Sequence, residues 1–421
     1  MTNDALHRSY DALLFDLDGV LYRGDEPVPG AASALAGLRA DSATIRFLTN
    51  NSARTPVQIA KRLGGMGIEA QPSEILTSGL ATAALLRREG TTGTAFVVGE
   101  RGVREALEEA GIQTVDGDPD RVDLVVVGWD RELTYDKLRT AALLVQRGAR
   151  LVATNADVTY PAPDGLWPGA GSILAAVVAA SGATPTVVGK PSRPLFEAAA
   201  EETGASRPLV VGDRLDTDVA GASNMGWDSF LVTTGASHLP DLLDSPIIPT
   251  FVAGSLAALL EPRLPARPRA ATLEDVGGIA DLLRRSGLSP DGLEARVATA
   301  ATVVLPVSDG PAAVAGILPV EPGLGVLRGV AVDERFRGQG LASIVVAAAA
   351  RHAARGGVHT LALFTDGAAE FFGRLGFDRI EKADLPAGVI DVPDLAEHCA
   401  DSAVAMIRAI APAGPAGQPD P

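Results

Sequence analysis

Short apolar runs that each end in a glycine constrain the fold of this chain more than any other feature. Four such runs are Phe96–Gly99, Val125–Gly128, Val187–Gly189 and Val210–Gly212. Segments with the apolar spacing of helices lie among them, over 102–110, 135–147 and 193–203. Strands that alternate with helices predict a parallel sheet with both faces covered. Since ligands of such sheets bind beyond the carboxyl ends of the strands, we expect functional residues there.

Charge balance and apolar content exclude several classes of protein. Hydrophobic residues make up 47% of the 421 residues, which is enough for folded cores. Acidic residues outnumber basic ones by 52 to 36 and give a net charge of −16, whereas nucleic-acid binding needs a basic face. The chain has no signal-like start and no run of about 18 apolar residues, the length that a membrane span needs. We therefore expect no nucleic-acid or membrane partner and a cytoplasmic location.

A proline-rich segment separates two α/β patterns. Residues 261–269 hold three prolines and no apolar periodicity, which is typical of a linker. Beyond it, we expect strands over 313–318 and 326–332 and a helix over 341–350. The last ten residues are rich in Pro, Gly and Ala, so we expect a disordered tail over 412–421.

Two carboxylates follow the first apolar run of the chain. Asp16 and Asp18 come directly after residues 12–15 and precede Gly19. Aspartate is a poor strand former, and residues two apart on an extended chain point the same way. Two close carboxylates repel each other unless a cation or a proton lies between them, and Mg²⁺ prefers such oxygen ligands. The alternative, an Asp-Gly turn after a buried strand, is about equally compatible with this motif alone.

Further polar groups follow three later strands that we expect. They are Thr49, Asn50 and Asn51 after 44–48, Lys190 after 187–189, and Asp213 with Asp218 after 210–212. Each alone has an ordinary structural explanation, such as a helix cap, a solvated lysine or a turn. Their joint occurrence at strand ends instead predicts a site for a phosphate group and a divalent cation.

These four motifs, in this order, resemble the haloacid dehalogenase (HAD) superfamily. The likeness is to the branch with p-nitrophenylphosphatase, phosphoglycolate phosphatase and ribonucleotide monophosphatase, and it covers about residues 8–260. It implies a Rossmann-like α/β core over 1–82 and 186–262, with an α/β cap inserted over 83–185. The resemblance also implies a small phosphomonoester as the substrate, and a homo-oligomer could form through the cap.

The resemblance also implies roles for individual residues. Asp16 would be the nucleophile that forms an aspartyl-phosphate, and Asp18 the general acid and base. The Mg²⁺ ligands would be the carboxylates of Asp16 and Asp213 and the backbone carbonyl of Asp18. The substrate phosphate would be bound by Thr49, Asn50, Asn51 and Lys190. Asp218 would support the metal or orient Lys190.

The second pattern contains a glycine loop between an expected strand and an expected helix. The Arg-x-x-Gly-x-Gly motif at 335–340 and the later segment 371–377 resemble the GCN5-related N-acetyltransferase (GNAT) family, over 270–411 after a linker at 263–269. The residues that would bind acetyl-CoA or CoA are Arg335, Arg337, Gly338 and Gly340. Phe372 stands where many members have a tyrosine acid, and Glu321 is the single candidate base. A working amine acetyltransferase and a CoA-binding or structural appendage both remain open.

Several functions compete for the whole chain. Its two-part architecture resembles actinobacterial glycerol-3-phosphate phosphatases, so we expect glycerol 3-phosphate as the substrate. The alternatives within the class are 2-phosphoglycolate and nucleoside monophosphates. From other classes, the chain could be an acetyltransferase with an N-terminal sensor module, or a binding protein without catalysis. The paired Asp16 and Asp18 disfavour both.

Overall fold

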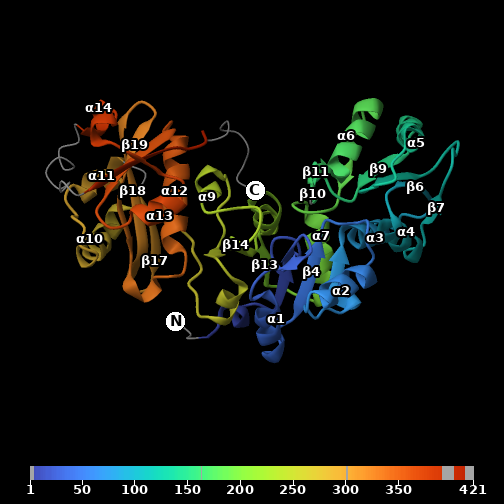
Figure 1. Cartoon of the computed structure of the whole chain (residues 1–421), viewed down its shortest axis with the longest axis horizontal. Coiled ribbons are helices and arrows are strands. Elements are labelled where there is room, and N and C mark those ends of the chain that lie inside the picture. Colours follow the sequence, from blue (N-terminus) through green and yellow to red (C-terminus); the bar gives the residue numbers. More distant parts are fainter. Residues whose placement is uncertain (1–3, 163, 300–301, 391–402, 413–421) are drawn as a thin grey trace. The chain divides into compact units, whose positions relative to one another are not determined.

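The chain forms two compact units, seen in a computed structural model that describes residues 4–162, 164–299, 302–390 and 403–412 (Figure 1). The first unit comprises Met1–Gly235 and Ser255–Pro262, and the second comprises Ala236–Gly254 and Arg263–Pro421. Both are mixed α/β structures, which confirms the predicted fold class. Of the tail predicted over 412–421, all but residue 412 lies outside the described residues.

A parallel sheet forms the centre of the first unit. Its strands in this unit lie in the order β14-β13-β1-β4-β5, so that β1 has β13 on one side and β4 on the other. The strands are β1 (Ala12–Phe15), β4 (Ile45–Thr49), β5 (Ile75–Thr77), β13 (Pro208–Gly212) and β14 (Asp228–Val232). The helices connected to them are α1 (Ala31–Ala40), α2 (Pro56–Gly65), α3 (Ser78–Arg88), α7 (Arg193–Thr203) and α8 (Ala220–Met225).

A second parallel sheet in the same unit occupies the region predicted as the cap. The order of its strands is β12-β9-β8-β6-β7. An antiparallel hairpin of β10 and β11 lies between β9 and β12 in the sequence. The strands are β6 (Thr94–Val98), β7 (Gln113–Val115), β8 (Leu124–Val127), β9 (Arg150–Ala153), β10 (Thr159–Ala162), β11 (Gly165–Pro168) and β12 (Thr186–Val187). The helices are α4 (Arg101–Glu109), α5 (Tyr135–Gln146) and α6 (Ala170–Ser181). A two-stranded ribbon of β2 (Tyr22–Arg23) and β3 (Glu26–Pro27) completes the unit's strands as described.

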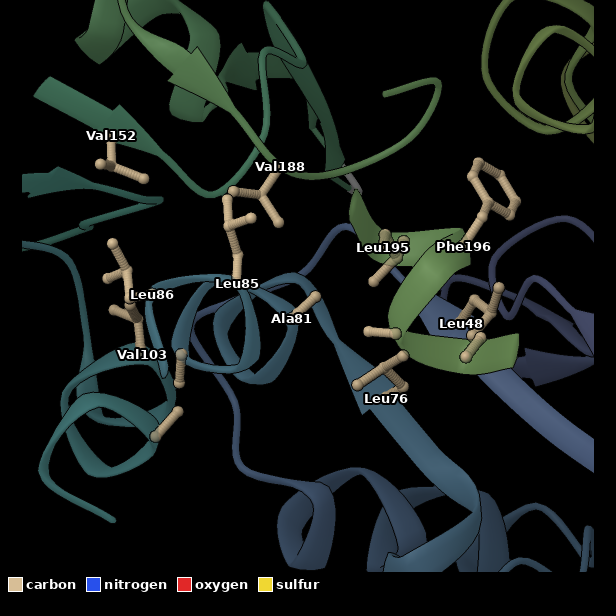
Figure 2. Packing of buried hydrophobic residues seen from close by; sticks show 14 of the residues in the cluster. Leu48, Leu76, Ala81, Leu85, Leu86, Val103, Val152, Val188, Leu195 and Phe196 are labelled. Atoms are coloured by element: carbon tan, nitrogen blue, oxygen red, sulfur yellow. The ribbon is translucent and has the colours of Figure 1, made fainter. Parts of the chain in front are cut away.

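One buried apolar cluster joins the two sheets of this unit. Figure 2 shows side chains of α3 between those of the first sheet and those of the second sheet. The cluster includes Leu48 and Leu76 from the first sheet, Leu85 and Leu86 from α3, and Val152 from the second sheet, each at most 8% exposed. Since burial of such side chains stabilises by about 1.5–3 kcal/mol each, this shared cluster stabilises the packing of the cap region on the core.

The second unit is built on a seven-stranded sheet of order β16-β17-β18-β19-β20-β22-β21. The parallel strands β19 and β20 pair only from Leu324–Thr360 to Val326–Ala362, so they separate beyond that point. The strands are β16 (Arg269–Ala270), β17 (Val303–Val307), β18 (Gly310–Glu321), β19 (Leu324–Val332), β20 (Thr360–Thr365), β21 (Asp378–Ile380) and β22 (Val404–Ala409). The helices are α10 (Val276–Arg285), α11 (Leu293–Thr299), α12 (Leu341–Arg355), α13 (Ala369–Arg374) and α14 (Ala387–Ile390).

One stretch falls in the second compact unit. It is 236–254, with α9 (Asp241–Asp244) and β15 (Phe251–Ala253), and the extent of the core over 186–262 stays a prediction. The physical reason is its packing, because α9 lies against α12 and Arg408 donates to the Asp244 carboxylate over 2.6 Å. Among the described residues, no helix has both the length and the apolar character required to span a membrane.

Candidate active site

Three of the predicted site residues lie at one edge of the first sheet. Asp16, Thr49 and Asp213 follow or end β1, β4 and β13, which are direct neighbours in the sheet. The register places Phe15 opposite Val211 on one side and Phe47 on the other. Adjacent parallel strands therefore bring these three side chains together at their carboxyl ends.

Three carboxylates and one lysine form the centre of the site. Oxygen atoms of Asp16, Asp213 and Asp218 lie within 4.8 Å of one another. Asp218 reaches this cluster from a single π-helical turn, Leu215–Val219, that begins three residues after the end of β13. The Lys190 ammonium group lies 2.7 Å from both Asp16 Oδ1 and Asp218 Oδ1 and is only 4% exposed.

The electrostatics of this centre leave room for another cation. Burial raises the pKa of Asp16 well above its ordinary value, and the nearby Asp218 and Asp213 raise it further, against the opposing effect of Lys190. Although burial lowers the pKa of Lys190, the two carboxylates beside it hold it above its ordinary value. One lysine cannot neutralise three carboxylates, and an all-oxygen donor set is the kind that Mg²⁺ prefers. The residues present therefore fit a divalent cation at Asp16, Asp213 and Asp218.

Asp18 lies apart from the carboxylate cluster and has partners of its own. The Tyr22 hydroxyl donates to its Oδ2 over 3.1 Å, and the Arg62 guanidinium lies 4.4 Å from the centre of the Tyr22 ring. Burial raises the pKa of Asp18, which favours the protonated form that a general acid needs. The neighbouring Gly19 turns the chain with a φ of +76°, so that its amide donates to the Tyr22 carbonyl.

The loop after β4 holds its own polar groups in hydrogen bonds. Thr49 Oγ1 accepts from the Asn51 amide over 3.1 Å, and Asn51 Oδ1 accepts from the Ala53 amide over 3.0 Å. Asn50 uses its side chain for Lys190 and for Asp157, a residue of the second sheet's region that we did not predict. From the sequence, we assigned Asp157 only to the cap predicted over 83–185.

The glycine loop of the second unit has the expected backbone, and its first arginine is paired with carboxylates. Gly338 and Gly340 both have positive φ angles, +78° and +80°, immediately before α12. The guanidinium of Arg335 is bound by Asp333 over 2.9 Å and lies 3.8 Å from Asp309. Asp333 is also paired with Arg285 over 3.3 Å. Arg337 donates to a main-chain carbonyl over 3.4 Å.

Two main-chain segments also lie against this loop. A Cβ atom at Gly340 would come within 2.6 Å of the Val252 carbonyl oxygen, and the Leu264 amide donates to the Gln339 side chain over 2.7 Å. Phe372 is 7% exposed and packs edge-to-face on Phe377, so it serves the core. The loop is thus conformationally suited to CoA, while its arginine and its outer surface are already engaged within the unit.

Comparisons with known proteins agree with this geometry. Residues 13–113 match a family described as haloacid dehalogenase-like hydrolase, and residues 187–259 match HAD-hydrolase-like proteins. Residues 285–377 match the acetyltransferase (GNAT) family. The acid sugar phosphatase of Staphylococcus epidermidis is 37% identical over 246 residues, which is 58% of this chain and 94% of the relative.

Solved structures give the same result. A p-nitrophenyl phosphatase from Archaeoglobus fulgidus is 33% identical with a TM-score of 0.56, covering 60% of this chain and 98% of its own. A glycerol phosphate phosphatase from Mycobacterium tuberculosis, in complex with magnesium, is 28% identical with a TM-score of 0.64. That likeness covers 82% of this chain and 92% of the other, and so extends into the second unit.

Proposed function

The chain belongs to the haloacid dehalogenase-like hydrolases, and from this premise we propose that it hydrolyses glycerol 3-phosphate to glycerol and phosphate through an aspartyl-phosphate. It is a phosphatase, and Mg²⁺ is its cofactor. The observation that carries the proposed aspartyl-phosphate mechanism is the buried centre of Asp16, Asp213 and Asp218 with Lys190 between two of the carboxylates.

In the first step, a carboxylate oxygen of Asp16 attacks phosphorus and the bond from phosphorus to the leaving oxygen breaks. Asp18 gives its proton to that oxygen, so that the alcohol leaves neutral. Mg²⁺, when bound, supplies positive charge that reduces the repulsion between the attacking carboxylate and the phosphate. Lys190 would contact the phosphate oxygens, where negative charge accumulates.

In the second step, water attacks the aspartyl-phosphate and Asp18 takes up its proton. The bond between Asp16 and phosphorus then breaks, and inorganic phosphate leaves. Thr49 and the loop amides beside it would hold the phosphate in both steps. The roles of Thr49, Asn51 and the Asp18 carbonyl remain predictions.

The choice of substrate rests on the extent of the likenesses. The glycerol phosphate phosphatase of M. tuberculosis matches this chain across both units, whereas the acid sugar phosphatases match only 58% of it. A sugar phosphate is therefore the second candidate, since these relatives have the higher identity. Phosphoglycolate and nucleotides remain alternatives. An acetyltransferase activity rests on the match at 285–377.

A phosphate-release assay over small phosphomonoesters tests the proposal. With Mg²⁺, glycerol 3-phosphate should give the highest kcat/KM, and EDTA should abolish turnover. A higher kcat/KM for a sugar phosphate would overturn the choice of substrate, while EDTA-resistant turnover would overturn the metal-dependent mechanism. The cytoplasmic location and a homo-oligomer formed through the cap stay predictions.

A further inference from the structure

The main chain of Lys190, the lysine that we propose binds the phosphate, is held by the side chain of Asn50, which follows β4. The Lys190 amide donates to Asn50 Oδ1 over 2.8 Å, and Asn50 Nδ2 donates to the Lys190 carbonyl over 3.0 Å. Asn50 thus binds both peptide groups of one residue, as a neighbouring strand would. This contact fixes the point from which the long lysine side chain reaches Asp16 and Asp218.

The same amide group of Asn50 also binds the cap region. Nδ2 donates to Asp157 Oδ2 over 3.0 Å. A carboxamide has two N–H groups, and both are therefore used within the chain. Asn50 consequently has no side-chain donor left for a substrate phosphate in this arrangement, although the sequence suggested such a role.

Asp157 is itself held rigidly in the cap region. Its amide donates to Asn155 Oδ1 over 3.1 Å, and its carbonyl accepts from the Gly171 amide at the start of α6 over 2.8 Å. Asn155 Nδ2 donates in turn to the Asn50 carbonyl over 2.7 Å. The loop between β9 and β10 therefore binds both the main chain and the side chain of Asn50.

Burial of the Asp157 carboxylate costs more free energy than its one strong contact offsets. Burial raises the pKa of Asp157, and the hydrogen bond from Asn50 only partly opposes this effect. Within the described ranges, Asp157 has no ion pair closer than 4 Å, so Asn50 is its hydrogen-bonded side-chain partner, while the charges of Arg214 and Lys190 act from farther away. An acid in this position gains little stability and calls for another explanation.

We propose that Asp157 is a positioning residue for the phosphatase reaction, acting on the Lys190 ammonium group through the side chain of Asn50. The inference rests on the proposed role of Lys190 in binding phosphate. Asp157 orients the carboxamide, the carboxamide fixes the Lys190 peptide, and the ammonium group is thereby kept in contact with Asp16. Since a displacement of about 1 Å at a reacting centre can cost about a hundredfold in rate, this support is functionally important.

Kinetics of Asp157 variants test the proposal. Asp157→Ala should lower kcat/KM by about tenfold to a hundredfold, whereas Asp157→Asn, which keeps an acceptor oxygen, should stay within about threefold of the wild type. In a double-mutant cycle, Asp157→Ala should have almost no additional effect once Lys190→Met is present, because both act on one group. If the losses of kcat/KM in the two single variants multiply in the double variant, the proposal is overturned.

Ser52→Ala provides a matched control. It removes another buried hydrogen bond between the core and the cap region, 3.0 Å long between Thr154 and Ser52, that does not involve Lys190. This variant should be destabilised without the same loss of kcat/KM. An equal loss in Ser52→Ala would mean that any weakened cap contact suffices, and the positioning role would be refuted.

Two further outcomes separate the hypotheses. If Asp157→Ala does not fold by circular dichroism, Asn50→Asp takes its place, since it replaces the donating nitrogen by a repelling oxygen and should cause the same loss. If the wild type is active and the positioning variant, Asp157→Ala or Asn50→Asp, is equally active, the inference is refuted but the proposed function is not. Absence of wild-type turnover on every phosphomonoester refutes the proposed function as well.

Discussion

At the scale of single residues, the site gathers more negative charge than its lysine neutralises. Asp16, Asp213 and Asp218 share one buried space with Lys190. In the absence of a metal, each carboxylate there is desolvated and repelled by the others. The site is therefore organised for binding a cation and not for the stability of the empty protein.

Replacement of Asp16 by Asn separates these two properties. We expect kcat to fall by at least about a thousandfold, because the amide cannot form the aspartyl-phosphate. In EDTA, the same variant should be more stable to urea than the wild type, because one buried charge is removed. Asp25→Asn, at a side chain that is 90% exposed, should change neither quantity. Wild-type turnover in Asp16→Asn would refute the assigned nucleophile.

The raised pKa of Asp16 also predicts how stability depends on pH without metal. A carboxyl group with a higher pKa in the folded state binds protons more tightly there than in the unfolded chain. The free energy of unfolding should therefore decrease as the pH rises from about 4 towards the folded-state pKa. We expect urea titrations in EDTA to show this decrease, and saturating Mg²⁺ to reduce it. A free energy of unfolding that rises over this range would contradict the prediction.

Sequence alone located the residues of this centre because each follows a recognisable strand. Asp16, Thr49 and Asp213 required only the rule that parallel strands end at one edge. The partner of Asn50 could not be found in this way. Its hydrogen bond to Asp157 spans 107 residues and depends on how the cap region folds back on the core.

At the scale of elements, the turn after β1 depends on the glycine at its centre. Gly19 has a φ of +76°, and a Cβ atom there would overlap the Asp213 carboxylate. The two short carboxylate-bearing segments after β1 and β13 therefore pack directly on each other. Any side chain at position 19 must displace the Asp213 carboxylate, which we propose as a metal ligand.

Gly19→Ala should accordingly weaken both stability and metal binding. The left-handed backbone alone costs about 1–2 kcal/mol with a Cβ atom, and the overlap adds to this. Gly24→Ala is the matched control, because Gly24 has a φ of +57° but no atom within 4 Å of the new Cβ. Magnesium titrations of both variants should reveal a loss of affinity in Gly19→Ala only. Equal affinities would disprove the steric argument.

In the second unit, the prediction concerns acetyl-CoA. Because Arg335 is neutralised by Asp333 and the Val252 carbonyl lies on Gly340, we expect no saturable heat when acetyl-CoA is added in calorimetry. A chain with Asp333→Asn, which removes the charged partner of Arg335, serves as a comparison. Saturable binding of one acetyl-CoA per wild-type chain would contradict the prediction and support the acetyltransferase alternative.

The alternation of strands and helices was predictable because it follows from local apolar periodicity. The expected helices over 135–147 and 193–203 correspond to α5 and α7. The assignment of 236–254 to the second unit was not predictable. It depends on the burial of Leu242 and Leu243 and on the pairing of Asp244 with Arg408, which is 164 residues away.

At the scale of the whole molecule, the net charge of −16 works against an anionic substrate. Long-range attraction cannot therefore concentrate a phosphomonoester at the site. We therefore expect substrate binding to depend on the local positive charge of Lys190 and of the proposed cation. Within the first unit, the electrostatic field at the carboxyl ends of β1 and β13 therefore matters more for substrate binding than the charge composition of the whole chain.

The division into two compact units predicts how the full chain responds to Mg²⁺. All three carboxylates of the proposed metal site lie in the first unit, so the cation should stabilise that unit alone. At a concentration one hundred times its Kd, a ligand contributes about 2.7 kcal/mol, or roughly 5 °C in Tm for a unit of this size. Differential scanning calorimetry should therefore resolve two transitions, of which only one shifts with Mg²⁺, and Asp213→Asn should abolish most of that shift. A single transition, or an equal shift of both, would mean that the two units unfold cooperatively.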